Sequence, residues 1–182
     1  MVVAASSTVY YYLELNQLDQ AREAILTAQA SLYDGCYPPD RFCYLHASGQ
    51  LELELGNLDA ALFFNDQAVE LAEYHSMAAN ICFAFAQRGT ILSAMGRYEP
   101  AIQACVKSQQ VAEQTGFQKT DGYLHNLAVL VQALHDGGRE ADAAFVAQDA
   151  KQCLAFVRKA GYQRRAVSKA VEILDAVSMA AG

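Results

Sequence analysis

Histidine and cysteine are the residues of this chain that could bind a metal or act as nucleophiles, and their spacing argues against both roles. His125 and His135 are the closest pair of histidines, and on one helix they would lie about 15 Å apart, too far to share a metal. The chain contains no Cys-x-x-Cys, and its cysteines are widely scattered. We therefore predict no metal site and reduced thiols at the five cysteines, Cys36, Cys43, Cys82, Cys105 and Cys153.

The motifs of the common catalytic and nucleotide-binding sites are absent from the sequence. There is no G-x-S-x-G, H-E-x-x-H, P-loop, G-x-G-x-x-G or EF-hand pattern. Cys82 and Cys105 are expected on the two helices of one hairpin, where a redox pair is the alternative to two buried free thiols. We predict that the protein is not an enzyme and binds no cofactor.

Composition indicates a folded, all-α protein. The 182 residues are 53% apolar and 18% charged, with three prolines and no tryptophan, and Ala, Leu, Glu and Gln dominate the long segments. No apolar run approaches the roughly 20 residues that span a bilayer, and the first residues lack the basic region of a signal peptide. We therefore expect a soluble, cytoplasmic protein.

Charge is distributed unevenly along the chain. The net charge is -7, which disfavours binding to nucleic acid or to an anionic membrane. Residues 1–80 carry a net charge of -9, whereas residues 81–182 carry +2. Six of the thirteen basic residues lie between Lys151 and Lys169, which predicts either a solvated helix face or a docking site for an acidic partner.

An internal repeat organises the sequence. The segments LNQLDQA, LGNLDAA, MGRYEPA and GGREADAA align, and the spacing of their anchor alanines is regular, with only the last interval slightly longer. A small residue follows each anchor seven positions later, on the same face of a helix because two turns take about 7.2 residues. The anchors are Ala21, Ala61, Ala101 and Ala143, and the small residues are Ala28, Ala68, Ser108 and Ala150.

Each repeat unit is predicted to be two helices joined by a tight turn. Gly56, Gly96 and Gly138 or, in the first unit, Asn16 would end the first helix in a left-handed cap. An acidic residue follows at the start of the second helix, where it favours the helix dipole. Asp40, after two prolines, is expected to cap the helix that follows it. The expected helices span 3–15, 18–33, 40–55, 58–75, 78–95, 98–115, 120–136, 139–160 and 162–179.

These units resemble tetratricopeptide repeats (TPR), with Gly49 and Gly89 in the small position in the middle of the first helix. The resemblance implies a right-handed superhelix of four antiparallel hairpins plus a closing helix. It gives one domain, 1–182, with units at about 1–37, 38–76, 77–117 and 118–160 and the closing helix at 162–179. The long period, about 40 residues, resembles the repeats of bacterial transcription activators of the maltose-regulator type and of sensor regions ahead of diguanylate cyclase domains.

The resemblance also implies a concave groove, lined by the first helix of each pair, that binds an extended or helical peptide. At the groove positions, this chain has none of the Lys, Asn and Arg residues with which some family members bind a terminal carboxylate. Its groove would be neutral and polar with titratable imidazoles, or else these residues are only solvated wall positions. The groove residues that the resemblance assigns are Tyr10, Glu14, His46, Gln50, Glu54, Phe83, Thr90, His125, Gln132 and His135.

These features predict a scaffold that binds a protein or peptide, as the regulatory or sensor module of a bacterial signalling or transcription protein. The alternative is a structural or oligomerising module with an empty groove. We expect binding to depend on pH near 6 to 7 through His46, His125 and His135, the usual range of imidazole. Because the helix expected at 3–15 is apolar on nearly every side, we also predict a weak homodimer through the first hairpin.

Overall fold

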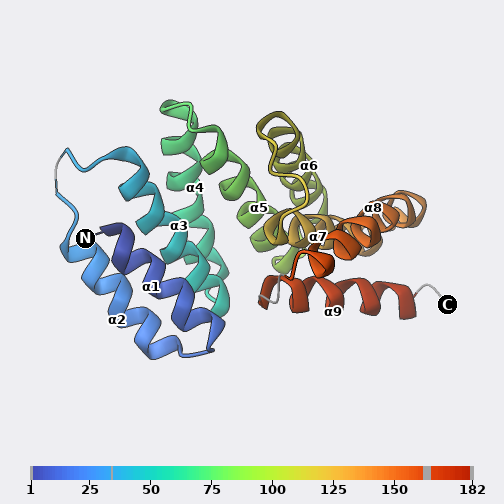
Figure 1. Cartoon of the computed structure of the whole chain (residues 1–182), viewed down its shortest axis with the longest axis horizontal. Helices are drawn as coiled ribbons and strands as arrows, with labels where there is room; N and C mark the ends of the chain where they lie inside the picture. Colours follow the sequence, from blue (N-terminus) through green and yellow to red (C-terminus); the bar gives the residue numbers. More distant parts are fainter. Residues whose placement is uncertain (1, 34, 162–164, 181–182) are drawn as a thin grey trace. The chain divides into compact units, whose positions relative to one another are not determined.

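The computed structural model describes residues 2–33, 35–161 and 165–180. Over these residues the chain forms nine α-helices and no strand, which confirms the all-α prediction (Figure 1). No helix in these ranges is both long enough and apolar enough to cross a bilayer. The helices are α1 Val2–Glu14, α2 Leu18–Ala30, α3 Pro38–Glu54, α4 Leu58–Tyr74, α5 Ala78–Ala94, α6 Tyr98–Thr115, α7 Asp121–Asp136, α8 Glu140–Lys159 and α9 Arg165–Ala180.

Most helices end in the same left-handed turn. Gly56, Ser76, Gly96 and Gly116 follow one another at equal intervals along the chain, and each has a positive φ. The next backbone N–H donates to the carbonyl five positions back, as in Asn57 N to Glu52 O at 2.9 Å, which is the Schellman motif. Asn16 has a φ of 56° and takes the place of glycine after α1, as the sequence predicts.

The start of α3 differs from the prediction that Asp40 caps it. The helix begins at Pro38, with Tyr37 in the cap position and Asp40 inside the first turn. The two prolines explain the difference, because a proline in the first turn gives up no hydrogen bond and its fixed φ already suits the helix. Asp40 still lies where a carboxylate favours the helix dipole.

The chain divides into two compact units, Met1–Ala84 and Phe85–Gly182, with the division inside α5. In unit 1, α1 packs on α2, α3 packs on α4, and α3 also contacts α1 and α2. A core cluster joins the first two hairpins, and its buried members are Val9, Leu13, Ala21, Ala24, Ala47 and Leu51. The division of the sequence into four repeat units stays a prediction.

In unit 2, α7 contacts α6, α8 and α9. Leu124 and Leu127 of α7 are almost completely buried, as are Val157 of α8 and Ala170 of α9. The predicted closing helix corresponds to α9, and residues 162–164 of that prediction lie outside the described residues.

The small residues of the repeat are buried between helices. All four anchor alanines and the four small residues seven positions later are at most 3% exposed. Gly89 of α5 has the same role, because a Cβ atom there would collide with the sulfur of Cys105 on α6. The pattern read from the sequence therefore marks where helices meet.

Two buried asparagines join neighbouring helices at equivalent positions of the repeat. Asn65 Nδ2 on α4 donates to the carbonyl of Ala84 on α5 at 2.9 Å. Asn126 Nδ2 on α7 donates to the carbonyl of Cys105 on α6 at 3.1 Å. Cys105 stands at the repeat position of Asn65, and Asn126 stands at that of Ala84. The two contacts therefore join the same pair of repeat positions, but the donating asparagine is on the other helix in the second contact.

Candidate functional site

The predicted groove residues lie on the first helix of each pair and fall in both units. Six belong to unit 1, on α1, α3 and the first turns of α5: Tyr10, Glu14, His46, Gln50, Glu54 and Phe83. Four belong to unit 2, on the rest of α5 and on α7: Thr90, His125, Gln132 and His135. Each set is therefore described separately.

In unit 1 the structure brings Tyr10, His46 and Phe83 together. The Tyr10 hydroxyl donates to Nδ1 of His46. Nε2 of the same ring donates to the backbone carbonyl of Phe83 at 3.4 Å. The ring of Phe42 stacks on that of His46, with centroids 5.5 Å apart. One imidazole thus links α1, α3 and α5, the first helices of three successive pairs.

Burial keeps this imidazole neutral. It lowers the pKa of His46 to about 4, and the bond to the Phe83 carbonyl only partly opposes that shift. Burial, together with the nearby Cys43, raises the pKa of Tyr10, so its hydroxyl stays a donor. His46 is therefore not expected to titrate near pH 6 to 7, which corrects the prediction of pH-dependent binding through this residue. The sequence could not show how neighbouring helices surround its ring.

The same three helices carry two carboxylates, one amide and one aromatic ring among the predicted residues, and we call this set the α1–α3–α5 face: Glu14, Gln50, Glu54 and Phe83. Glu14 is exposed, and the Phe83 side chain is 42% exposed. Nε2 of Gln50 donates to Oε1 of Glu54 at 3.2 Å, one turn along α3. Such a face can bind cationic groups and backbone N–H donors, with an aromatic contact beside them.

The predicted residues of unit 2 make mostly local contacts. The Thr90 hydroxyl donates to the carbonyl of Ala86 in its own helix at 3.1 Å. Nε2 of Gln132 donates to Asp136 Oδ1 at 2.7 Å, again within one helix. His125 and His135 lie on α7 and are half-buried.

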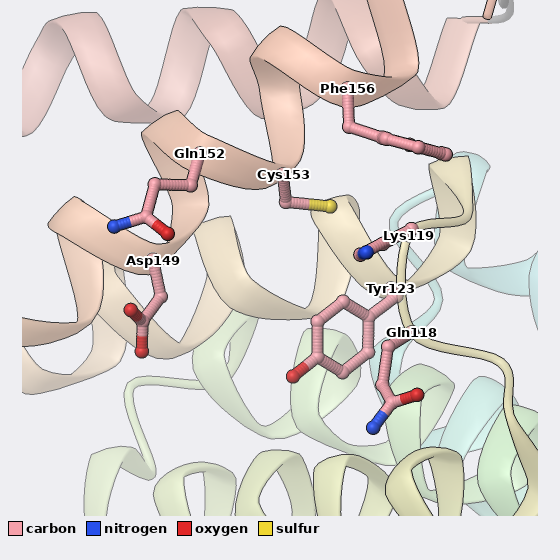
Figure 2. Close-up of a pocket in the computed structure, with 7 residues that line it drawn as sticks. All are labelled: Gln118, Lys119, Tyr123, Asp149, Gln152, Cys153 and Phe156. Carbon is pink, nitrogen blue, oxygen red and sulfur yellow. The ribbon is translucent and has the colours of Figure 1, made fainter.

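A pocket in unit 2 was not predicted from the sequence. It lies between the α6–α7 connection and α8 and has a volume of about 360 Å³ (Figure 2). The connection, 116–120, is longer than most others in the chain, and Lys119 in it has a φ of 70°. The wider spacing of the last two anchors, Ala101 and Ala143, was the signal that could have located it. Its lining is Gln118, Lys119, Tyr123, Asp149, Gln152, Cys153 and Phe156.

The pocket combines two aromatic rings with groups of opposite charge. The Lys119 ammonium lies 5.3 Å from the centre of the Phe156 ring, a cation–π contact. Burial raises the pKa of the Cys153 thiol, although the backbone N–H and the charge of Lys119 partly oppose this, so the thiol is protonated and a poor nucleophile. Burial also raises the pKa of Tyr123.

No three His, Cys, Asp or Glu side chains come together to hold a metal in the part of the chain that the structure describes.

Comparison with known proteins places the fold. No protein-family model matches the chain, and no curated protein matches it. A crystal structure of nearly identical TPR-like repeats, assigned to a kinesin light chain of Podosopora anserina, is similar with a TM-score of 0.67 and 14% identity, covering 96% of this chain and 93% of that one. A single-substitution variant of the same protein has the same TM-score and identity, with 92% of that chain covered. The chain therefore has a TPR-like helical-repeat fold.

Proposed function

We propose that this protein is a non-enzymatic scaffold that binds a protein or peptide through the α1–α3–α5 face. The TPR-like fold supports a role in protein interaction, because stacked helical repeats expose long continuous helix faces. The long repeat period, which resembles that of bacterial regulators, supports a place as the regulatory or sensor module of a cytoplasmic signalling or transcription protein.

The observation that carries this proposal is the hydrogen-bonded link from Tyr10 through His46 to the Phe83 carbonyl. It holds three first helices in a fixed arrangement, so the groups beside it are presented on a rigid surface. A rigid surface loses little conformational entropy on binding.

Charge indicates what kind of peptide would fit. No Lys or Arg occurs between Arg41 and Arg88, whereas α3 contributes two of the carboxylates of this stretch, Glu52 and Glu54. The face itself carries Glu14 and Glu54 with the exposed ring of Phe83. A peptide with a Lys or Arg beside an apolar residue would satisfy both features.

Selection of peptides from a displayed library against the intact protein tests this proposal. For the selected peptides, we expect Phe83→Ala to weaken binding at least tenfold and Glu54→Gln about threefold, the latter only at low salt. The matched controls are Phe63→Ala and Glu70→Gln, at exposed positions of α4 in the same unit. Peptides that bind the Phe83 and Glu54 variants normally, or that respond only to the α4 variants, contradict the proposal.

The second candidate function is self-association through the first hairpin, and the exposed apolar residues of α1 and of the turn after it favour this function. Val3, Tyr11 and Leu15 are 45%, 62% and 50% exposed, and the Tyr11 ring contacts Tyr12 edge-on at 5.6 Å. Sedimentation velocity over a hundredfold range of concentration is the test. We expect a weak dimer that Tyr11→Gln abolishes, and a monomer at every concentration contradicts it.

A further inference from the structure

The pocket between the α6–α7 connection and α8 is a place where the repeat is interrupted. The connection is longer than its counterpart between α4 and α5, at 75–77. Lys119 in this connection has a left-handed conformation, which is costly for a residue other than glycine. Lys119 is held there from two sides, because its backbone N–H bonds to Cys153 and its ammonium rests on Phe156.

The polar groups of the pocket come in two matched sets, one on each wall. Gln118 and Lys119 lie on the connection, and Asp149 and Gln152 lie on α8 across the ring of Tyr123 (Figure 2). Each wall thus offers one charged group and one side-chain amide. The amides can both donate and accept hydrogen bonds, as a peptide group requires.

The two charges restrict the kind of ligand. Lys119 and Asp149 are both exposed, and among the described residues neither has an ion-pair partner. A simple anion would be repelled by Asp149, and a simple cation by Lys119. A neutral molecule would leave both charges unused, whereas a zwitterion pairs with each of them.

Size and apolar surface restrict the ligand further. A volume of about 360 Å³ is near the lower end of the roughly 300–1,000 Å³ that small-molecule sites occupy. Tyr123 and Phe156 supply ring surface, and Cys153, which is 7% exposed, also lines the pocket. These features suit a short ligand with an apolar body between its charged ends.

We propose that this pocket binds a zwitterionic peptide of about dipeptide size, with its carboxylate toward Lys119 and its ammonium toward Asp149. Gln118 and Gln152 bind the peptide group, and the side chains pack on Tyr123 and Phe156. The site lies wholly in unit 2 and is independent of the α1–α3–α5 face of unit 1.

Calorimetric titration of the whole chain with leucyl-phenylalanine tests the proposal, alongside the N-acetylated and C-amidated forms of the same dipeptide. From the binding energy per atom of small ligands, we expect a Kd of roughly 0.1–1 mM for the free dipeptide. Blocking either end removes one charge and should weaken binding about five- to tenfold.

Two variants assign each charge to its partner. Asp149→Asn should weaken binding of the free dipeptide about five- to tenfold. The Asp149→Asn protein should then bind the free and N-acetylated forms with equal affinity. Lys119→Met should weaken binding of the free dipeptide by a similar factor, and the Lys119→Met protein should bind the free and C-amidated forms with equal affinity. The controls are Asp175→Asn and Lys107→Met, at exposed positions outside the pocket, and we expect them to bind like the wild type. Thermal melting of each variant checks that it is folded.

Three outcomes overturn the proposal. The first is the absence of binding at about 5 mM dipeptide, well above the expected Kd. The second is equal affinity for the free and blocked forms in the wild type. The third is a dipeptide-induced change in amide NMR shifts confined to the α1–α3–α5 face, which would support the proposed scaffold function and remove the pocket site.

Discussion

The side chain of His46 connects three helices of unit 1. Its two ring nitrogens have different tasks, because Nδ1 accepts from Tyr10 and Nε2 donates to the Phe83 carbonyl. In the neutral ring with its proton on Nε2, Nδ1 can accept from Tyr10 while Nε2 donates to the carbonyl. Protonation would turn Nδ1 into a donor, so the Tyr10 hydroxyl would have to accept instead, and burial disfavours the charged ring.

We predict that His46 makes unfolding depend on acid. Its pKa is about 4 in the folded protein against 6.5 for an unperturbed histidine. The contribution of His46 to the free energy of unfolding is complete above pH 6.5 and is lost as the pH falls from 6.5 toward 4. Over that range the histidine binds a proton in the unfolded chain but not in the folded chain. The expected slope is at most about 1.4 kcal/mol per pH unit.

Urea denaturation of the wild type and His46→Gln between about pH 7.5 and 4.5 measures this effect. The variant should be less stable near pH 7.5 and should lose less stability on acidification. Because carboxylates titrate in both proteins, the difference between the two curves is the relevant quantity. Parallel curves would contradict the prediction.

We predict that Gly89→Ala is destabilising by about 1–3 kcal/mol, the usual cost of an overfilled contact. The added methyl group would meet the sulfur of Cys105, which is completely buried. Adding Cys105→Ala should relieve the collision, so the double variant should lose less than the two single losses combined. Chemical denaturation of the four proteins measures the coupling, and strict additivity would show that the sulfur is not the obstacle.

At the scale of the helices, the repeated left-handed turn sets where each helix stops. Glycine occupies this turn after α3, α5 and α6, but serine occupies it after α4, where Ser76 has a φ of 51°. A side chain makes that conformation costly, and serine lacks the local tolerance that asparagine has at Asn16. The turn after α4 is therefore the one that sequence change could improve.

We predict that Ser76→Gly raises the free energy of unfolding by about 0.5–1 kcal/mol. The matched control is Ser93→Gly inside α5, where glycine should lower stability by a similar amount because the helix already has a negative φ. Thermal and urea denaturation of both variants measure the two changes in stability, a gain for Ser76→Gly and a loss for Ser93→Gly. A loss of stability for Ser76→Gly would mean that its side chain has a role that the turn geometry does not show.

At the scale of the whole molecule, charge separates along the same division as the fold. Unit 1 has eleven carboxylates and two arginines, a net charge of -9, and unit 2 has nine carboxylates and eleven basic residues, a net charge of +2. Repulsion within unit 1 is concentrated on α4, which has no basic residue. There Asp66, Glu70 and Glu73 are spaced four and three positions apart on one exposed side.

We predict that Glu70→Gln stabilises the protein by about 0.5 kcal/mol at low salt, because it removes like-charge contacts four positions from Asp66 and three from Glu73. The gain should shrink between about 20 and 200 mM NaCl as screening increases. Glu172→Gln on α9 is the control, since its neighbour Lys169 is of opposite charge. A gain for Glu70→Gln that is the same at both salt concentrations would contradict the electrostatic explanation.

The sequence by itself determined the helices, their ends and the faces that are buried. Ala21 and Ala61 are anchors because small residues seven apart lie on one side of a helix, and Gly56 and Gly96 end helices because they adopt a positive φ. These properties depend on residues within a turn or two along the chain. Because a periodic sequence pattern reflects these local properties, the all-α repeat fold could be predicted from it.

Only the tertiary structure decided what the site residues do. Tyr10, His46 and Phe83 could be placed on their helices from the sequence, but the bonds between them join residues 36 and 37 positions apart. The lowered pKa of His46 follows from its enclosure, and the pocket follows from how the α6–α7 connection meets α8. Such contacts depend on the rotation and separation of packed helices, which every side chain in the core sets together and no local pattern records.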